Sequence, residues 1–282
     1  MTGSTSNWNL EQDGPRKGAH VHFEACRSDP ETVRRIYRIA LDWFKKLGLA
    51  PNTMQVFGTK LHSKPTKFHL AHAKLEKIGF EGMEGFFIHC EEPDTGEKRP
   101  PRFATFSYWS GRNSHVGFFA RGLFCDMREE AMYTTVGALI ECARPQYGYG
   151  GWDEVSLDDF VDSMPQIDAH QVPHDWSIGE SRGLWNYGFV GGWLWSFTFL
   201  PDGALSASID GMSLREWICA APDRGTLYPQ AQGLTLWFVP TELRKPVFLK
   251  LWDSGLIFKF EEDWPRIEAL AEPQWAKKKV AL

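Results

Sequence analysis

Residues 126–152 constrain the fold most, because a helical pattern there ends abruptly in a segment rich in glycine and aromatic residues. Asp126 is a suitable N-cap, and Glu129 and Glu130 place carboxylates in the first turn, at the positive end of the helix dipole. Apolar residues then recur at steps of three and four, which predicts one buried helix face. This face consists of Ala131, Val136, Leu139, Ile140 and Ala143. Pro145 is expected to end the helix.

Residues 146–152 follow the proline and contain three glycines, two tyrosines and one tryptophan. We interpret this segment as a glycine-rich turn, which cannot easily bury three large rings. Tyr147, Tyr149 and Trp152 are therefore predicted to be exposed anchors for a protein partner, because tyrosine and tryptophan dominate interface hot spots. The alternative is that the three rings fill a gap between two lobes.

Acidic residues are concentrated after this helix, although the formal net charge is only −5. Residues 126–181 contain twelve acidic residues and two arginines, and the remaining 29 basic and 24 acidic residues make the rest of the chain slightly basic. This balance disfavours direct nucleic-acid binding through the segment and favours a basic protein partner. A solvated acidic surface without a partner is the other explanation. The acidic residues assigned to the partner-binding surface are Asp153, Glu154, Asp158, Asp159, Asp162, Asp168 and Asp175.

The rest of the chain predicts an α+β fold with a mainly antiparallel sheet. Residues 20–26 alternate as in a half-buried strand, with His20, His22 and Glu24 on one side. Asp29-Pro30-Glu31 then opens a helix that is expected to end at Gly48. Strands or extended segments are expected at 54–57, 84–91, 102–108, 114–120, 234–239 and 256–260, and on either side of Gly191-Gly192, with 84–91 and 102–108 forming a hairpin. Helices are expected at 65–78, after the capping box Ser213–Glu216 and at 241–254, and a turn is expected at Pro201-Asp202-Gly203.

The predicted organisation is one domain or two closely packed lobes over residues 19–262, with a junction near 144–153 in the second case. Residues 1–18 are polar and predicted to be a disordered tail, and residues 263–282 a partly helical basic tail. The five cysteines are odd in number and widely spaced, so we interpret them as reduced core thiols. No signal-peptide pattern and no apolar run of about 18 residues is present, which predicts a cytoplasmic protein without a membrane span.

Histidine pairs are the strongest hint of catalytic chemistry. His69 and His72 share a helix face, and His170 and His174 lie near Asp168 in the sequence, but neither pair has further ligands at a spacing typical of zinc sites. Nucleophile-elbow and phosphate-loop motifs are absent. We therefore expect no catalytic residues, no metal and no cofactor. A metal-dependent hydrolase using His170, His174 and nearby acidic residues is the alternative, and an assembly protein with its own homo-oligomeric interface is a third.

Several short motifs carry a resemblance. They are Ala143-Arg144-Pro145-Gln146-Tyr147-Gly148, Ser213-Leu214-Arg215-Glu216-Trp217-Ile218, Gly225-Thr226-Leu227, Leu234-Thr235-Leu236-Trp237 and Gly255-Leu256-Ile257-Phe258. With these motifs, residues 125 to 260 resemble the immunity protein 52 family of bacterial polymorphic-toxin and type VI secretion systems. The resemblance implies a non-enzymatic cytoplasmic protein that binds and neutralises a cognate secreted toxin, often a nuclease. It implies no catalytic residue and leaves the toxin and the oligomeric state open.

Overall fold

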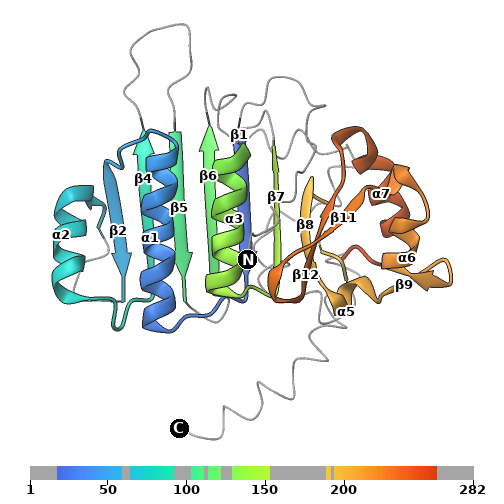
Figure 1. The fold of residues 1–282 in the computed structure, drawn as a ribbon, viewed down its shortest axis with the longest axis horizontal. Coiled ribbons are helices and arrows are strands. Elements are labelled where there is room, and N and C mark those ends of the chain that lie inside the picture. The colour runs from blue at the N-terminus through green and yellow to red at the C-terminus, as the bar shows by residue number, and fades with distance from the viewer. Residues whose placement is uncertain are drawn as a thin grey trace, which may run out of the picture.

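The computed structural model describes residues 18–58, 64–91, 103–110, 114–121, 129–152, 189–191 and 194–258. Within these ranges, ten strands form one sheet in the order β11-β12-β8-β7-β1-β6-β5-β4-β2-β3, and every neighbouring pair is antiparallel (Figure 1). The predicted α+β fold with a mainly antiparallel sheet is confirmed. The strands are β1 (Gly18–Glu24), β2 (Thr53–Phe57), β3 (Thr66–Lys67), β4 (Gly85–Glu91), β5 (Phe103–Trp109), β6 (His115–Arg121), β7 (Tyr147–Trp152), β8 (Phe197–Pro201), β11 (Thr226–Pro229) and β12 (Leu234–Phe238).

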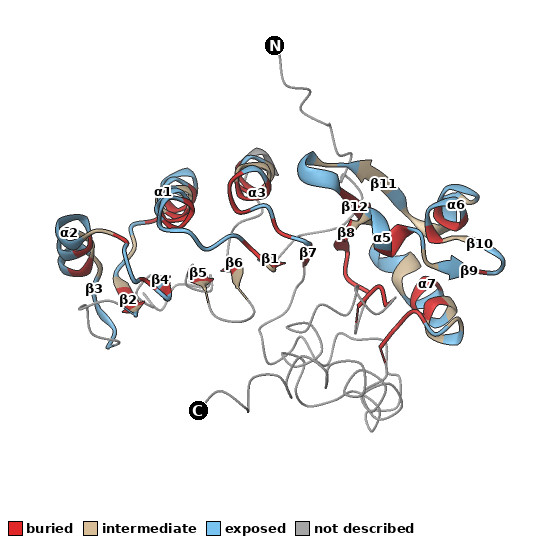
Figure 2. Cartoon of the chain, turned by 90° about the horizontal axis from the view of Figure 1, so that it is seen from below, coloured by how far each residue is buried: buried red, intermediate tan, exposed pale blue. Residues whose placement is uncertain are grey.

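Helices cover opposite faces of the two halves of this sheet (Figure 2). The helices α1 (Pro30–Lys46), α2 (Phe68–Ile78) and α3 (Glu129–Ala143) lie on one face of the half that contains β1 to β6. The C-terminal half adds α5 (Asp202–Leu205), α6 (Leu214–Cys219), α7 (Thr241–Asp253), the 3-10 turns Pro222–Arg224 and Ala231–Gly233, and a small hairpin of β9 (Ser208–Ile209) and β10 (Met212–Ser213).

The alternation of side chains along the strands separates two hydrophobic clusters. On β8, Phe197 and Phe199 belong to the cluster with α1 and α3, whereas Leu200 belongs to the cluster with α5, α6 and α7. Because successive side chains of a strand point to opposite faces, the two helix groups pack on opposite sides of the sheet. The sheet face opposite α1 and α3, from β1 to β2, is therefore not covered by any helix that the structure describes.

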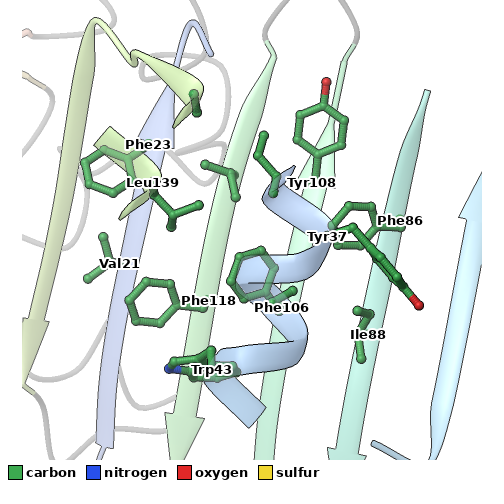
Figure 3. Packing of buried hydrophobic residues seen from close by; sticks show 14 of the residues in the cluster. Val21, Phe23, Tyr37, Trp43, Phe86, Ile88, Phe106, Tyr108, Phe118 and Leu139 are labelled. Carbon is green, nitrogen blue, oxygen red and sulfur yellow. The ribbon is translucent and has the colours of Figure 1, made fainter. Parts of the chain in front are cut away.

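Trp43 of α1 belongs to the larger cluster and lies under Phe106 and Phe118 in the view of Figure 3. Its side chain is fully buried, and its ring packs against Phe106 of β5 and Phe118 of β6 with centroid distances of 5.9 and 5.1 Å. Val21 and Phe23 of β1 and Leu139 of α3 extend the same layer. The apolar stripe of α1 and the inward side chains of β1, β5 and β6 thus fix the position of the sheet under the helices.

The start of α1 follows the capping rules that its sequence predicts. The Asp29 carboxylate accepts hydrogen bonds from the backbone N–H of Thr32 at 3.0 Å and from the Thr32 hydroxyl at 2.6 Å, and Pro30 occupies the first helical turn. These hydrogen bonds from Thr32 hold the pKa of Asp29 below its usual value. The cap therefore stabilises the fold when Asp29 is ionised.

Replacing this cap should destabilise the protein in a pH-dependent way. Asp29→Ala is expected to lower the free energy of unfolding by about 1 kcal/mol at pH 7. Because the pKa of Asp29 is lower in the folded chain, its contribution is present above about pH 4 and is lost as the pH falls through the folded-state value. Urea denaturation at pH 7 and pH 3 measures both losses. Asp29→Asn, which keeps an acceptor for Thr32, is the matched control, and a loss that is equal at both pH values would contradict the role of the ionised cap.

Most predicted elements occur where the patterns place them, including the capping box, in which Ser213 and Glu216 bond each other's backbone N–H. The predicted helix at 65–78 begins only at Phe68, because the two residues before it pair with β2. The predicted turn at Pro201-Asp202-Gly203 is instead the start of the short helix α5. The strand predicted at 256–260 is reduced in the described residues to one parallel bridge between Gly191 and Ile257.

Of the four described cysteines, three are buried as expected and one is exposed. Cys26, Cys90 and Cys142 are buried free thiols, and burial raises the pKa of Cys26 and of Cys142 above the usual range. Cys219 is exposed, because it lies at the end of α6 beyond the buried Ile218. The described helices include none that is both long and apolar enough to cross a membrane.

Candidate functional site

The predicted aromatic turn is a central strand of the sheet. Residues Tyr147–Trp152 form β7, which pairs with β1 on one side and with β8 on the other. The interpretation of this segment as a turn is wrong, because Gly148 and Gly150 alternate with Tyr147 and Tyr149, and each pair faces one side of the sheet. Gly148 and Gly150 face α3, where a β-carbon would collide with the Phe23 ring and with the His20 carbonyl oxygen.

The two tyrosines of β7 face the other side of the sheet. Tyr147 is 2% exposed and packs in the cluster of α5, α6 and α7, so the prediction that it is an exposed anchor is wrong. The sequence could not show that these distant helices cover the ring. Tyr149, two residues further along β7, is half-buried and keeps part of its ring accessible.

The remaining predicted partner-binding residues are not placed by the structure. The side chain of Trp152 lies outside the described part of the chain. The acidic residues assigned to the partner-binding surface and the two histidines of the alternative metal hypothesis also lie outside the described residues. They are Asp153, Glu154, Asp158, Asp159, Asp162, Asp168, Asp175, His170 and His174. Their role in binding therefore stays a prediction, with β7 as the element that leads into them.

Tyr149 is one of four rings that form a continuous stacked row, which we call the ring row. In order, its members are His115, His22, Tyr149 and Trp195. Their centroids are 5.0, 5.0 and 4.8 Å apart in that order, with interplanar angles of 29°, 29° and 21°. The row crosses from β6 over β1 to β7 and ends on the residue that precedes β8 by two positions. His20 meets the Trp195 ring edge-on at 5.0 Å.

Strand register explains why these rings meet. His22 lies opposite Tyr149 in the β1–β7 ladder and opposite Gly117 in the β1–β6 ladder. A β-carbon at Gly117 would approach Nδ1 of His22 to 3.1 Å. Glycine at this position leaves the space in which the imidazole reaches the ring of His115, two residues away on the same face of β6.

The ring row is uncharged at its centre. Burial is the main cause that lowers the pKa of His22 to about 3, and the neighbouring His115 and His20 lower it further. Glu24 lies 3.9 Å from Nε2 of His22, but the low pKa keeps the imidazole neutral near pH 7, so this contact is not an ion pair there. The central imidazole of the row is therefore neutral near pH 7.

The buried imidazole should make stability depend on pH. The unfolded chain, in which a histidine has a pKa near 6.5, binds a proton at higher pH than folded His22, so stability falls as the pH falls from about 6.5 to about 3. His22→Gln is expected to flatten the profile by up to about 1.4 kcal/mol per pH unit. Urea denaturation between pH 3 and pH 8 measures this slope. His69→Gln, at an exposed position of α2, is the matched control, and an unchanged slope in His22→Gln would contradict the low pKa.

Further aromatic side chains continue this face of the sheet toward β2. Phe87 of β4 is 40% exposed, and Trp109 of β5 and Phe57 of β2 are half-buried and meet edge to face at 5.1 Å. Such surfaces suit protein contacts, because aromatic rings provide large contact areas and can stack on aromatic or guanidinium groups of a partner. We define the open sheet face as His115, His22 and Tyr149 of the ring row together with Phe57, Phe87 and Trp109, whereas Trp195 at the end of the row is buried.

Metal-ligating groups of three or more histidine, cysteine or acidic residues do not occur within the described ranges. His72, one of the two histidines on α2, forms a 2.8 Å hydrogen bond between its Nδ1 and the Tyr37 hydroxyl. Its ring also stacks on the Phe68 ring at a centroid distance of 5.4 Å. His69 is exposed on the same helix. The contacts of His72 give it a packing role between α1 and α2.

Sequence reasoning recognised only one part of this site. The alternation at 20–26 placed His20, His22 and Glu24 on one side of a strand, which the structure confirms. The contacts with His115 and Trp195 were not foreseen, because they depend on the order of strands that lie far apart in the chain.

Comparisons with known proteins show a similar fold but do not identify a family. Neither a family model nor a curated protein matches this chain. Among solved structures, the Pseudomonas aeruginosa T6SS protein PA0821 is similar, with a TM-score of 0.54, 9% identity, and coverage of 86% of this chain and 74% of that one. The toxic C-terminal tip of CdiA from Pseudomonas aeruginosa in complex with immune protein matches at a TM-score of 0.25 and 13% identity, over 49% of this chain and 88% of that chain, which is too low to indicate a common fold. The chain thus has a fold similar to that of a type VI secretion protein.

Proposed function

We propose that this chain is a cytoplasmic immunity protein that binds a cognate secreted toxin and blocks it by protein–protein contact. The observation that carries the proposal is the resemblance of the sequence to immunity proteins. The sequence resembles immunity proteins over residues 125 to 260, and the fold is similar over 86% of the chain to that of a T6SS protein. A likeness at 9% identity supports the fold alone, so the toxin-binding activity rests on the resemblance and on the surface of the protein.

The open sheet face and the acidic segment after β7 supply a surface that suits such a partner. A nuclease toxin must present lysine and arginine to phosphate, and carboxylates on an inhibitor can cover these groups and accelerate association. Tyr149 of β7 precedes the acidic segment by four residues in the sequence and contacts the neutral His22 ring of β1, and aromatic rings of this kind can interact with arginine side chains of a partner. We assign the toxin as a basic nuclease domain on this argument.

The proposal is tested by contact competition between sister cells. A strain that lacks this gene is mixed on a solid surface with the wild type, and its recovery is expected to fall, because without the inhibitor the delivered toxin stays active. A plasmid copy should restore recovery, and a wild-type competitor without a working secretion apparatus should cause no loss. Equal recovery of the deletion strain beside an active competitor would contradict the proposed function.

A further inference from the structure

A pocket of about 580 Å³ opens at the end of the sheet where β1 leaves and β7 enters. This volume lies in the range of small-ligand sites. Its buried lining is apolar or weakly polar and comes from four separate segments: Cys26, Pro145, Ala204 and Leu234. Its exposed lining is cationic or amide-bearing and consists of Arg27, Arg144, Gln146 and Gln232 together with glycines.

The backbone around this pocket is strained at three non-glycine residues that have a positive φ. Among the described residues, four that are not glycine have a positive φ, and three of these line the pocket: Ala25 at 53°, Arg144 at 46° and Gln232 at 62°. The fourth, Asp210, forms the two-residue turn of the β9–β10 hairpin with Gly211. Such conformations cost about 1–3 kcal/mol each and persist where the surrounding structure holds them, often at ligand sites.

Two backbone hydrogen bonds hold the arginines at this place. The N–H of Arg27 donates to the carbonyl oxygen of Ala143 at 2.7 Å, and the N–H of Gln146 donates to the carbonyl oxygen of Glu24 at 3.0 Å. These bonds join the end of β1 to the segment between α3 and β7. Arg27 and Arg144 therefore reach the same rim from two elements whose backbones are locked together.

The acidic side chains near this rim are already engaged. Asp29 accepts two hydrogen bonds from Thr32 as the cap of α1, and Asp202 of α5 pairs with Arg215 at 2.7 Å. The described part of the chain gives neither Arg27 nor Arg144 an ion pair. The pocket thus combines an apolar floor with a rim that carries two arginines, of which Arg27 also interacts electrostatically with Asp29.

We propose that this pocket binds a carboxylate carried on a small apolar group. The apolar group would occupy the floor at Pro145 and Leu234, and the carboxylate would accept charge-assisted hydrogen bonds from Arg27 and Arg144, with the Gln146 and Gln232 amides at its sides. A polypeptide C-terminus with an aliphatic last residue and a free branched-chain fatty acid share this chemistry. The inference is independent of the proposed toxin binding, because it rests on other residues and is tested on the purified chain alone.

Isothermal titration of the full chain with three probes distinguishes these sources: acetyl-Ala-Ala-Leu with a free carboxylate, the same peptide with a C-terminal amide, and 3-methylbutanoate. Binding of either carboxylate, with the amide at least about tenfold weaker, is the expected result. Binding of the peptide acid only identifies a chain terminus as the ligand, and binding of both acids identifies the carboxylate with its apolar group. If neither acid binds, or if the amide binds as well as the acid, the proposal is overturned.

Two variants separate ligand binding from folding. Arg144→Gly removes the guanidinium and also relieves the positive φ, so the melting temperature should be kept or raised while carboxylate affinity falls at least about tenfold. Arg27→Gln should cause a similar loss, and Arg38→Gln, which removes an exposed arginine of α1 outside the pocket, is the charge-matched control. Unchanged affinity in both Arg144→Gly and Arg27→Gln, or an equal loss in Arg38→Gln, would overturn the assignment of the pocket.

Discussion

Trp43→Ala is expected to lower the free energy of unfolding by about 3–5 kcal/mol, a large part of the stability of a typical domain. The Trp43 side chain is fully buried between α1 and the sheet, and its removal leaves a cavity bordered by Phe44, Phe106 and Phe118. Neighbouring strands of one sheet cannot collapse into such a cavity without loss of their ladder. Urea denaturation followed by far-ultraviolet circular dichroism measures the change.

Trp109→Ala is the matched control for this prediction. Trp109 lies on the opposite side of β5, is half-buried on the open sheet face, and packs edge to face on Phe57. Its removal should cost less than half of the loss in Trp43→Ala, because most of the space it leaves is filled by water. Equal losses in the two variants would contradict the placement of the main core between the sheet and α1.

Charge reversal at three acidic residues of the segment after β7 should weaken binding of the proposed toxin by on the order of ten- to a hundredfold. The variant is Asp158→Lys, Asp159→Lys and Asp162→Lys. Most of the loss is expected in the association rate, and it should shrink at high salt, because exposed charges steer a basic partner over distances that salt screens. Surface plasmon resonance at two salt concentrations measures both effects.

A control with the same change of net charge places three lysines elsewhere on the surface: Glu76→Lys, Glu81→Lys and Glu141→Lys. These positions are exposed on α2, on the turn after it and on α3. Their reversal should leave the toxin affinity within about threefold of the wild-type value, since they are not among the residues assigned to the proposed surface. If the two triple variants weaken binding equally, or if neither does, the acidic segment is not the binding surface.

The local rules that predicted most of the fold are those with a direct physical cause in neighbouring residues. Asp29-Pro30 and the Ser213–Glu216 box mark helix starts because their side chains or ring act on the next few backbone N–H groups, and both starts are confirmed. The alternation at 20–26 predicted the inward side chains Val21 and Phe23, which are 1% and 0% exposed. These features depend on residues that are only a few positions apart in the sequence.

The segment 146–152 shows where this reasoning failed. Glycine was taken as a sign of a turn, although Tyr147, Gly148, Tyr149 and Gly150 alternate with the period of a strand. Glycine is required here because Phe23 and the backbone of β1 approach β7 closely on the side of α3. Burial of Tyr147 and formation of the ring row depend on distant strands and helices, so they could not be read from the local pattern.

Co-purification from a toxin-producing native host tests the central claim most directly. The tagged protein is recovered under moderate salt, and the proteins bound to it are identified and quantified. The immunity function predicts a basic toxin domain in near-equal amount, because one inhibitor must cover one toxin to neutralise it. Recovery of the protein alone from cells that are shown to contain the toxin would contradict the account.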